Sequence, residues 1–171
     1  MTQSAEQRLA HICVLVRDID QAIGHYRKIL SAVSPQLLKE EVKKQEKFAG
    51  KDRYLTAFFH APGAGCDIQL LQPLDPESPL YKRLEKHGEG LHHIAFASSR
   101  LEDTFRLLKE KAVTLHGEKF IYDADDPKTR WAWILPQYAH GVLIEVMDEY
   151  KRIKGNTGQK TQGAGMISEK R

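Results

Sequence analysis

The sequence has few cysteines, little net charge and no long apolar run. Its only cysteines, Cys13 and Cys66, lie in apolar segments, which favours reduced buried thiols over a disulfide framework. The net charge is +3, and no basic stripe is interleaved with aromatic residues, so we expect no nucleic-acid partner. No run approaches the roughly 18 apolar residues of a membrane span, and no apolar segment precedes the first charges. These absences predict a globular cytoplasmic protein without a membrane partner.

The chain contains an internal repeat. The segment LAHICVLVRDIDQAI from Leu9 aligns without a gap on LHHIAFASSRLEDTF from Leu91, at an offset of 82 residues. Further along each half, GCDIQLL from Gly65 aligns on GVLIEVM from Gly141, at an offset of 76. The difference between the two offsets falls in the loops. Because self-similarity of this kind indicates repeated structural units, we expect two equivalent modules.

Each half also has a predicted helix after its first strand. Apolar residues recur at helical spacing over 19–30, where Asp18 is the expected cap, and over about 100–112, where Ser99 is the expected cap. Each half has room for two more strands before its closing strand. Their predicted ranges are 36–41 and 54–60 in the first half and 114–121 and 132–135 in the second. The sequence therefore predicts an α+β fold made of two tandem βαβββ modules.

The expected module boundaries follow from this pattern. The first module spans 8–73 and the second 91–148. The linker, residues 74–90, contains a short helix that Ser78 and Pro79 begin and Gly88 ends. Residues 149–171 are rich in lysine, glycine and glutamine with few apolar side chains, so we expect a disordered tail.

Two adjacent histidines stand in the stretch GEGLHHIAF. Neighbouring side chains of a strand point to opposite faces, so His92 and His93 are not expected in the same site. The face of His93 also carries two alanines, which leave room for a ligand, whereas the face of His92 is bulky and suits packing under helices. The repeat aligns His93 with His11. We therefore expect His93 inside a functional site and His92 outside it.

Gln69 and Glu145 occupy the same position in the two closing strands, each between apolar neighbours. A glutamate buried there without a partner would be costly. Each polar residue taken alone is more often a satisfied core or surface group. Together with His11 and His93, at equivalent places in two repeats, they form a mixed nitrogen and oxygen set suited to a divalent transition metal. We expect one ion per chain, and Co, Mn, Ni, Zn and Fe are all compatible with these ligands.

The quoted segments resemble those of the vicinal oxygen chelate superfamily, which includes glyoxalases and bleomycin-resistance proteins. The phrases IQLLQP and SPLYKRLEKHGEGLHHIAF are most similar to the methylmalonyl-CoA epimerases, and the similarity covers residues 8–148. The resemblance implies a cup-shaped mixed sheet around a metal site, with His11, Gln69, His93 and Glu145 as ligands. It also implies a homodimer and a small-molecule substrate with vicinal oxygens, such as a CoA thioester.

The chemistry implied by this resemblance is epimerisation or isomerisation. A metal chelated by two substrate oxygens polarises the carbonyl, which makes the adjacent C–H more acidic. Glu145 is the expected acid/base residue. In the epimerases an acidic residue of the third strand serves as a base, but Ala57 stands at the aligned position here. Glu46 and Asp52 are nearby carboxylates, and the sequence favours neither as a replacement.

Other functions of the same superfamily stay open at this point. A glyoxalase-type lyase or an epimerase of sugar-like ketones would use the same four ligands. An extradiol dioxygenase would bind Fe(II) through two histidines and one glutamate, and Gln69 argues against it. A metal-free ligand-binding or resistance protein would have no use for the four ligands.

Arg130 and Trp133 are candidate substrate-binding residues. Arg130 follows an insertion-like loop and is suited to holding a substrate carboxylate. The alternatives are that Arg130 pairs with Asp125 or Asp126 and that a tryptophan packs in the core.

Overall fold

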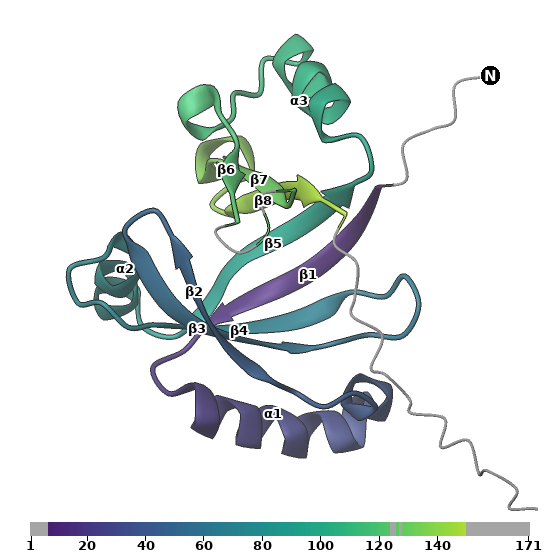
Figure 1. Ribbon diagram of the computed structural model, residues 1–171, viewed down its shortest axis with the longest axis vertical. Coiled ribbons are helices and arrows are strands. Elements are labelled where there is room, and N and C mark those ends of the chain that lie inside the picture. The colour runs from purple at the N-terminus through teal and green to yellow at the C-terminus, as the bar shows by residue number, and fades with distance from the viewer. Residues whose placement is uncertain (1–6, 124–125, 127, 150–171) are drawn as a thin grey trace, which may run out of the picture.

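A computed structural model describes residues 7–123, 126 and 128–149 of the chain. It confirms the α+β class, because a single eight-stranded mixed sheet curls into a nearly closed cup with three helices around it (Figure 1). The first half contains β1 (Gln7–Leu15), α1 (Ile19–Val33), β2 (Lys44–Ala49), β3 (Asp52–Phe59) and β4 (Asp67–Pro73). The linker between the halves contains α2 (Pro79–His87). The second half contains β5 (Gly90–Ser98), α3 (Leu101–Glu110), β6 (Ile121–Tyr122), β7 (Arg130–Ile134) and β8 (Ile144–Asp148).

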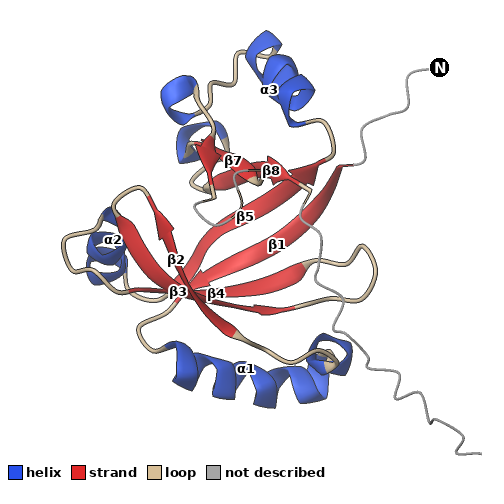
Figure 2. Ribbon diagram, viewed as in Figure 1, coloured by secondary structure: helices blue, strands red, loops and turns tan. Residues whose placement is uncertain are grey.

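The strand order is β2-β3-β4-β1-β5-β8-β7-β6, so the two halves meet at the centre of the sheet. β1 runs parallel to β4 and β5 runs parallel to β8, whereas β1 and β5 pair antiparallel. Each half thus contributes its opening and closing strands to the middle of the cup (Figure 2). The described part of the predicted tail is limited to Glu149, and the rest lies outside the described residues.

Helix α1 covers the outer face of the first half (Figure 1). The Asp18 carboxylate accepts a hydrogen bond of 2.9 Å from the Gln21 amide, as predicted for its cap. Ile23 on its buried face packs in one cluster with Phe59 and Leu70 of the sheet. The helix runs three residues past the predicted range and ends before Ser34.

Helix α3 packs on the outer face of the second half, where Leu101 is buried against Ala132 and Val146. The predicted cap at Ser99 is wrong. Ser98 instead accepts a hydrogen bond of 3.2 Å from the Arg100 amide, just before the helix begins.

Two of the four inner strand predictions are wrong in position. Residues Pro35–Leu38 form a 3-10 helix, and the strand expected at 36–41 lies at Lys44–Ala49. The range 114–121 contains a 3-10 helix at His116–Glu118. The strand expected there is limited to Ile121–Tyr122, and Leu115 forms an isolated bridge with Ile134. The other two predictions agree with β3 and β7 to within two residues.

Helix α2 closes one end of the cup on its concave side. Ser78 caps it by accepting a hydrogen bond from the Tyr81 amide, and Gly88 ends it with a φ of 76°, a conformation that favours glycine. Leu80 and Leu84 of this helix pack in one cluster with Cys13 of β1.

The two edges of the sheet approach one another across the mouth of the cup. Lys47 Nζ on β2 lies 3.5 Å from Asp123 Oδ1, directly after β6. Ala49 of β2 also packs against the cluster that contains Trp131 of β7. These contacts join the first half to the second and hold the cup nearly closed.

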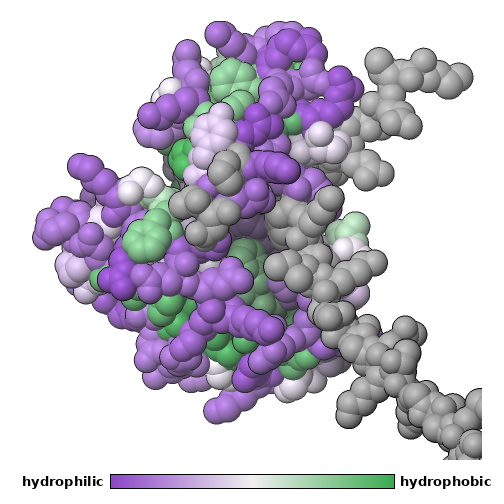
Figure 3. Space-filling view, viewed as in Figure 1, coloured by the Kyte–Doolittle hydropathy of each residue, from purple (hydrophilic) through white to green (hydrophobic). Residues whose placement is uncertain are grey.

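The outer face of β1 and β5 is only partly covered. Leu9 and Phe96 are register partners there and remain 36% and 39% exposed, so the expectation that this bulky face packs under helices is wrong for Phe96. The side of the molecule in Figure 3 is mostly hydrophilic, with apolar residues in small groups. Within the described residues, no helix is both long enough and apolar enough to cross a membrane.

Candidate metal centre

Four polar side chains converge on the concave face of the four central strands. They come from β1, β4, β5 and β8 and are all buried, with exposures of 3% to 9%: His11, Gln69, His93 and Glu145. The repeat therefore brings its two pairs of equivalent residues to one place. The structure places together all four residues that the sequence predicts as ligands.

Three of these side chains direct atoms at one another. The Nε2 atoms of His11 and His93 lie 3.0 Å apart, and each lies 3.2 Å from Glu145 Oε2. Burial opposes ionisation of Glu145, but hydrogen bonds from the two histidines outweigh it and hold the pKa of the carboxyl well below its ordinary value. Burial lowers the pKa of His93, which favours a neutral ring, and its Nε2 can bind a metal when the ring proton is on Nδ1. The cluster therefore offers two imidazole nitrogens and an ionised carboxylate.

Gln69 completes the set with an amide oxygen. Its Nε2 donates a hydrogen bond of 3.0 Å to Thr56 Oγ1, which fixes the orientation of the amide. Its Oε1 is buried and has no hydrogen-bond partner among the described residues. A buried carbonyl oxygen left unsatisfied is costly, and coordination to a cation would satisfy it. The four residues therefore fit a divalent transition metal.

His92 also lines the cavity, contrary to the prediction from strand alternation. On β1, Cys13 pairs with His93 and the next residue, Val14, pairs with Leu91, so His92 is the extra residue of a β-bulge. Its Nδ1 lies 2.8 Å from Nδ1 of His93. A bulge leaves no signal in the apolar pattern of a single strand, so this contact could not be predicted from the sequence.

A cavity of about 200 Å³ opens above the cluster. Its walls are rich in aromatic rings: the Trp133 ring lies 5.0 Å from that of His93, and the Phe58 ring lies 5.6 Å from that of His11, both as centroid distances. Trp133 thus lies in the cavity, as expected, and so does Trp131. Tyr54 is a further cavity residue that the sequence did not single out, and burial raises its pKa, so its phenol stays protonated.

The second carboxylate sought from the sequence is not close to the cluster. Ala57 packs among the outer core residues beneath α1, so it does not face the cavity at all. Glu46 forms an exposed ion pair with Arg53. Asp52 lines the cavity, but it accepts a hydrogen bond from the Leu80 amide. It also lies four positions, or about 13 Å of strand, from Thr56.

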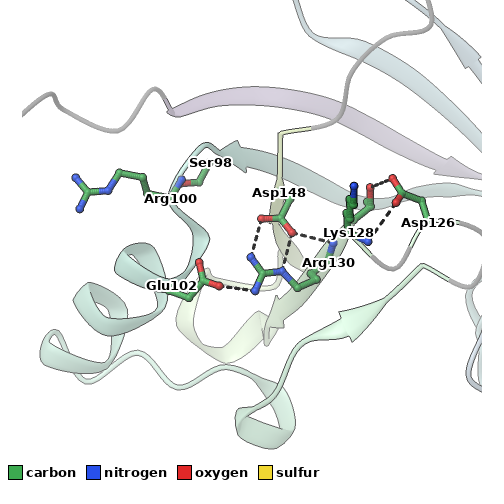
Figure 4. Close-up of polar contacts among 8 residues, drawn as sticks. Ser98, Arg100, Glu102, Asp126, Lys128, Arg130 and Asp148 are labelled. Carbon is green, nitrogen blue, oxygen red and sulfur yellow. Dashed lines mark hydrogen bonds and ion pairs between the residues drawn. The ribbon is translucent and has the colours of Figure 1, made fainter.

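Arg130 does not line the cavity, which corrects the expectation that it holds a substrate carboxylate there. Its side chain lies on the other face of β7 from Trp131. There its guanidinium makes two hydrogen bonds to Asp148, of 2.8 and 3.1 Å, and a further ion pair with Glu102 (Figure 4). Neither of these partners is Asp126, and Asp125, the other aspartate of the sequence alternative, lies outside the described residues. Arg130 therefore joins β7, β8 and α3.

Comparison with known proteins agrees with this fold. A family model described as the glyoxalase/bleomycin resistance protein/dioxygenase superfamily matches residues 10–129. The chain belongs to this superfamily.

One sequence relative and two solved structures show what this chain is most usefully compared with. The chain is 32% identical over 141 residues to the uncharacterized protein YqjC of Bacillus subtilis (strain 168), an alignment that covers 82% of this chain and 91% of YqjC. It is similar to the methylmalonyl-CoA epimerase of Mycobacterium tuberculosis, with a TM-score of 0.65, 28% identity, and coverage of 84% and 89% of the two chains. A Streptomyces coelicolor methylmalonyl-CoA epimerase variant, solved with 2-nitronate-propionyl-CoA, gives a TM-score of 0.64 and 25% identity over 83% of this chain and 94% of that one.

Proposed function

We propose that this protein is a divalent-metal-dependent epimerase or isomerase that moves a proton next to a chelated carbonyl. The observation that carries the proposal is the convergence of His11, Gln69, His93 and Glu145, including the buried Gln69 Oε1 that lacks a hydrogen-bond partner among the described residues. Co, Mn, Ni, Zn and Fe all suit this ligand set. Similarity to the methylmalonyl-CoA epimerases supports an activity of this class.

Two substrate oxygens would enter the centre from the cavity. A bound divalent cation supplies Lewis acidity that lowers the barrier to enolate formation by several kcal/mol. The protein's residues hold the substrate above the cluster: Trp133 and Phe58 exclude water on two sides, and Tyr54 keeps its proton and is suited to donate a hydrogen bond to a substrate oxygen.

Glu145 is the proposed acid/base residue. Its carboxylate is ionised and lies on the cavity floor, so it can accept the proton from the carbon next to the carbonyl. Loss of this proton from Glu145 to solvent, with delivery of a solvent proton to the other face of the carbon, would give the epimer. Transfer of the proton from Glu145 to a neighbouring atom would give an isomer.

The cavity also indicates the size of the reacting group. Its volume of about 200 Å³ is below the roughly 300–1,000 Å³ of pockets that enclose drug-sized ligands. We propose that it receives the acyl end of a larger molecule or a small hydroxyketone. A CoA thioester is compatible, with its nucleotide outside the cavity, and the Streptomyces epimerase structure with 2-nitronate-propionyl-CoA supports this substrate class.

Deuterium exchange tests the proposed reaction. The metal-loaded protein is offered 2-acyl thioesters, 2-hydroxyketones and hemithioacetals in deuterated water, and the label is followed by mass spectrometry. We expect exchange of one C–H without oxygen uptake in one substrate class, and its loss in Glu145→Gln with metal content measured in the same sample. Glu46→Gln is the matched control, because Glu46 is exposed and outside the cavity. Exchange retained in Glu145→Gln would contradict the role of Glu145, and oxygen uptake with a catechol would favour a dioxygenase.

We propose in addition that the chain forms a homodimer. The partly exposed apolar pair Leu9 and Phe96 on the outer face of the central strands supports an interface there. Sedimentation velocity tests it: a dimer that dissociates in Phe96→Lys would agree, and a monomeric wild-type protein would contradict it.

A further inference from the structure

The adjacent histidines 92 and 93 make a contact that neither the fold nor the four-ligand set requires. His93 presents Nε2 to His11 and Glu145, at 3.0 and 3.2 Å, and presents Nδ1 to Nδ1 of His92, at 2.8 Å. A neutral imidazole carries one proton, on one of its two nitrogens. If His93 Nε2 is to donate its lone pair to a metal, the proton must be on Nδ1, and His92 Nδ1 must then accept it in a hydrogen bond.

The internal repeat shows that the imidazole is not needed to build the bulge. Leu9 pairs with Phe96 and His11 with Ala95, so Ala10 is the extra residue of a matching bulge on β1. Ala10 is fully buried, and it aligns with His92 at the same offset of 82 residues that aligns His11 with His93. A methyl group therefore suffices at this position in the first half, whereas the second half carries a hydrogen-bonding ring aimed at a ligand.

We infer that His92 is a positioning residue of the proposed metal centre, which accepts the Nδ1 proton of His93 and so holds the His93 ring with Nε2 directed at the metal. The inference rests on the proposed metal-dependent function and extends it to a residue outside the ligand set. Groups that accept a hydrogen bond from a ligating histidine fix its tautomer and orientation, and their removal typically weakens metal affinity 10- to 100-fold. Thr56 has the corresponding role for Gln69, which it holds through the amide nitrogen.

Measuring the metal affinity of His92 variants distinguishes a hydrogen-bonding role of His92 from a packing role. Apoprotein is titrated with Zn²⁺ alone against a chromogenic chelator. We expect 10- to 100-fold weaker binding in His92→Ala, which copies the first half, and in His92→Leu, which fills the space without an acceptor. We expect affinity near the wild-type value in His92→Asn, because its side-chain oxygen stands where Nδ1 stood. His87→Ala is the control for loss of an imidazole, since His87 is exposed on α2.

Nitrogen NMR of the zinc-loaded wild-type protein gives a second test that needs no variant. We expect a slowly exchanging proton on His93 Nδ1 and the His92 proton on Nε2. A His92 ring protonated at Nδ1, or His92→Ala and His92→Leu binding as tightly as wild type, would overturn the inference while leaving the metal site in place. A folded wild-type protein that binds no Zn²⁺ or other divalent ion would overturn the proposed function, and the inference with it.

Discussion

The Nε2 atoms of His11 and His93 lie 3.0 Å apart, although 82 residues separate them in the chain. The distance is short because β1 and β5 are antiparallel neighbours at the centre of the sheet. Glu145 Oε2 lies 3.2 Å from both nitrogens. Three strands thus place three ligand atoms around one point, and the amide of Gln69 comes from the next strand along.

Replacing Thr56 with valine should weaken the metal centre without removing a ligand. The change deletes the oxygen that accepts the hydrogen bond from Gln69 Nε2, which leaves a buried donor unsatisfied and frees the amide to rotate. We expect roughly tenfold or greater loss of metal affinity and a decrease of about 1–3 kcal/mol in the free energy of unfolding. Chelator competition and urea unfolding measure the two effects. Thr56→Ser keeps the hydroxyl and should restore both, and failure of that rescue would count against the hydrogen bond.

Replacing Arg130 with alanine should affect stability and not substrate binding. Arg130 forms ion pairs with Asp148 and Glu102 (Figure 4). It does not line the cavity. Because the pair with Asp148 is bidentate and partly buried, we expect a loss of roughly 1–2 kcal/mol in urea unfolding. KM should remain near the wild-type value. A large rise in KM at unchanged stability would contradict this and would support a substrate-binding role for Arg130.

We expect the Tyr54 phenol to make the free energy of unfolding decrease at high pH. Burial raises the pKa of its phenol above the ordinary value of about 10, so the unfolded chain loses this proton at a lower pH than the folded one. The folded state then binds more protons than the unfolded state, and its stability decreases as the pH rises above about 10, by up to about 1.4 kcal/mol per pH unit.

Denaturant unfolding between pH 9 and pH 11 measures this effect. Tyr54→Phe should show a shallower decrease than wild type. Tyr122→Phe is the control, because Tyr122 is 56% exposed, and it should follow the wild-type curve. Identical slopes for Tyr54→Phe and wild type would contradict the burial of the phenol.

The two cysteines should differ in reactivity. Cys13 is fully buried, and burial raises the pKa of its thiol, whereas Cys66 is half-buried in the loop before β4. Since the thiolate is the reactive form, a disulfide reagent should modify Cys66 at least about tenfold faster than Cys13 in the folded protein. Both should react equally in denaturant. Mass spectrometry of the modified peptides tells the two apart, and fast modification of Cys13 in the native state would mean that the floor of the cup opens readily.

The repeat made the central strands and the four candidate ligands predictable. His11 and His93, and Gln69 and Glu145, are equivalent positions in strands that carry a clear apolar pattern. Strand β2 was misplaced because it is an edge strand whose residues are mostly exposed, so it has no apolar alternation to recognise.

Positions that depend on strand irregularity or on which face a residue occupies were harder to predict. His92 faces the cavity only because a bulge interrupts the alternation of β5. Ala57 was compared with a catalytic carboxylate, but the register of β3 turns it toward α1, and Thr56 and Phe58 face the cavity instead. The ion pairs of Arg130 could not be predicted from local sequence, because its partners Asp148 and Glu102 are 18 and 28 residues away.

Metal analysis of the purified protein tests the central claim most directly. Wild-type protein is stripped with a chelator, loaded with Co²⁺ or Zn²⁺ and freed of excess ion, and its metal content is measured by mass spectrometry alongside His93→Ala and the surface control His87→Ala. We predict about one ion per chain in wild type and in His87→Ala, and a large loss in His93→Ala with its circular dichroism spectrum unchanged. A folded wild-type protein that retains no ion, or a His93→Ala variant that retains as much as wild type, would contradict the account.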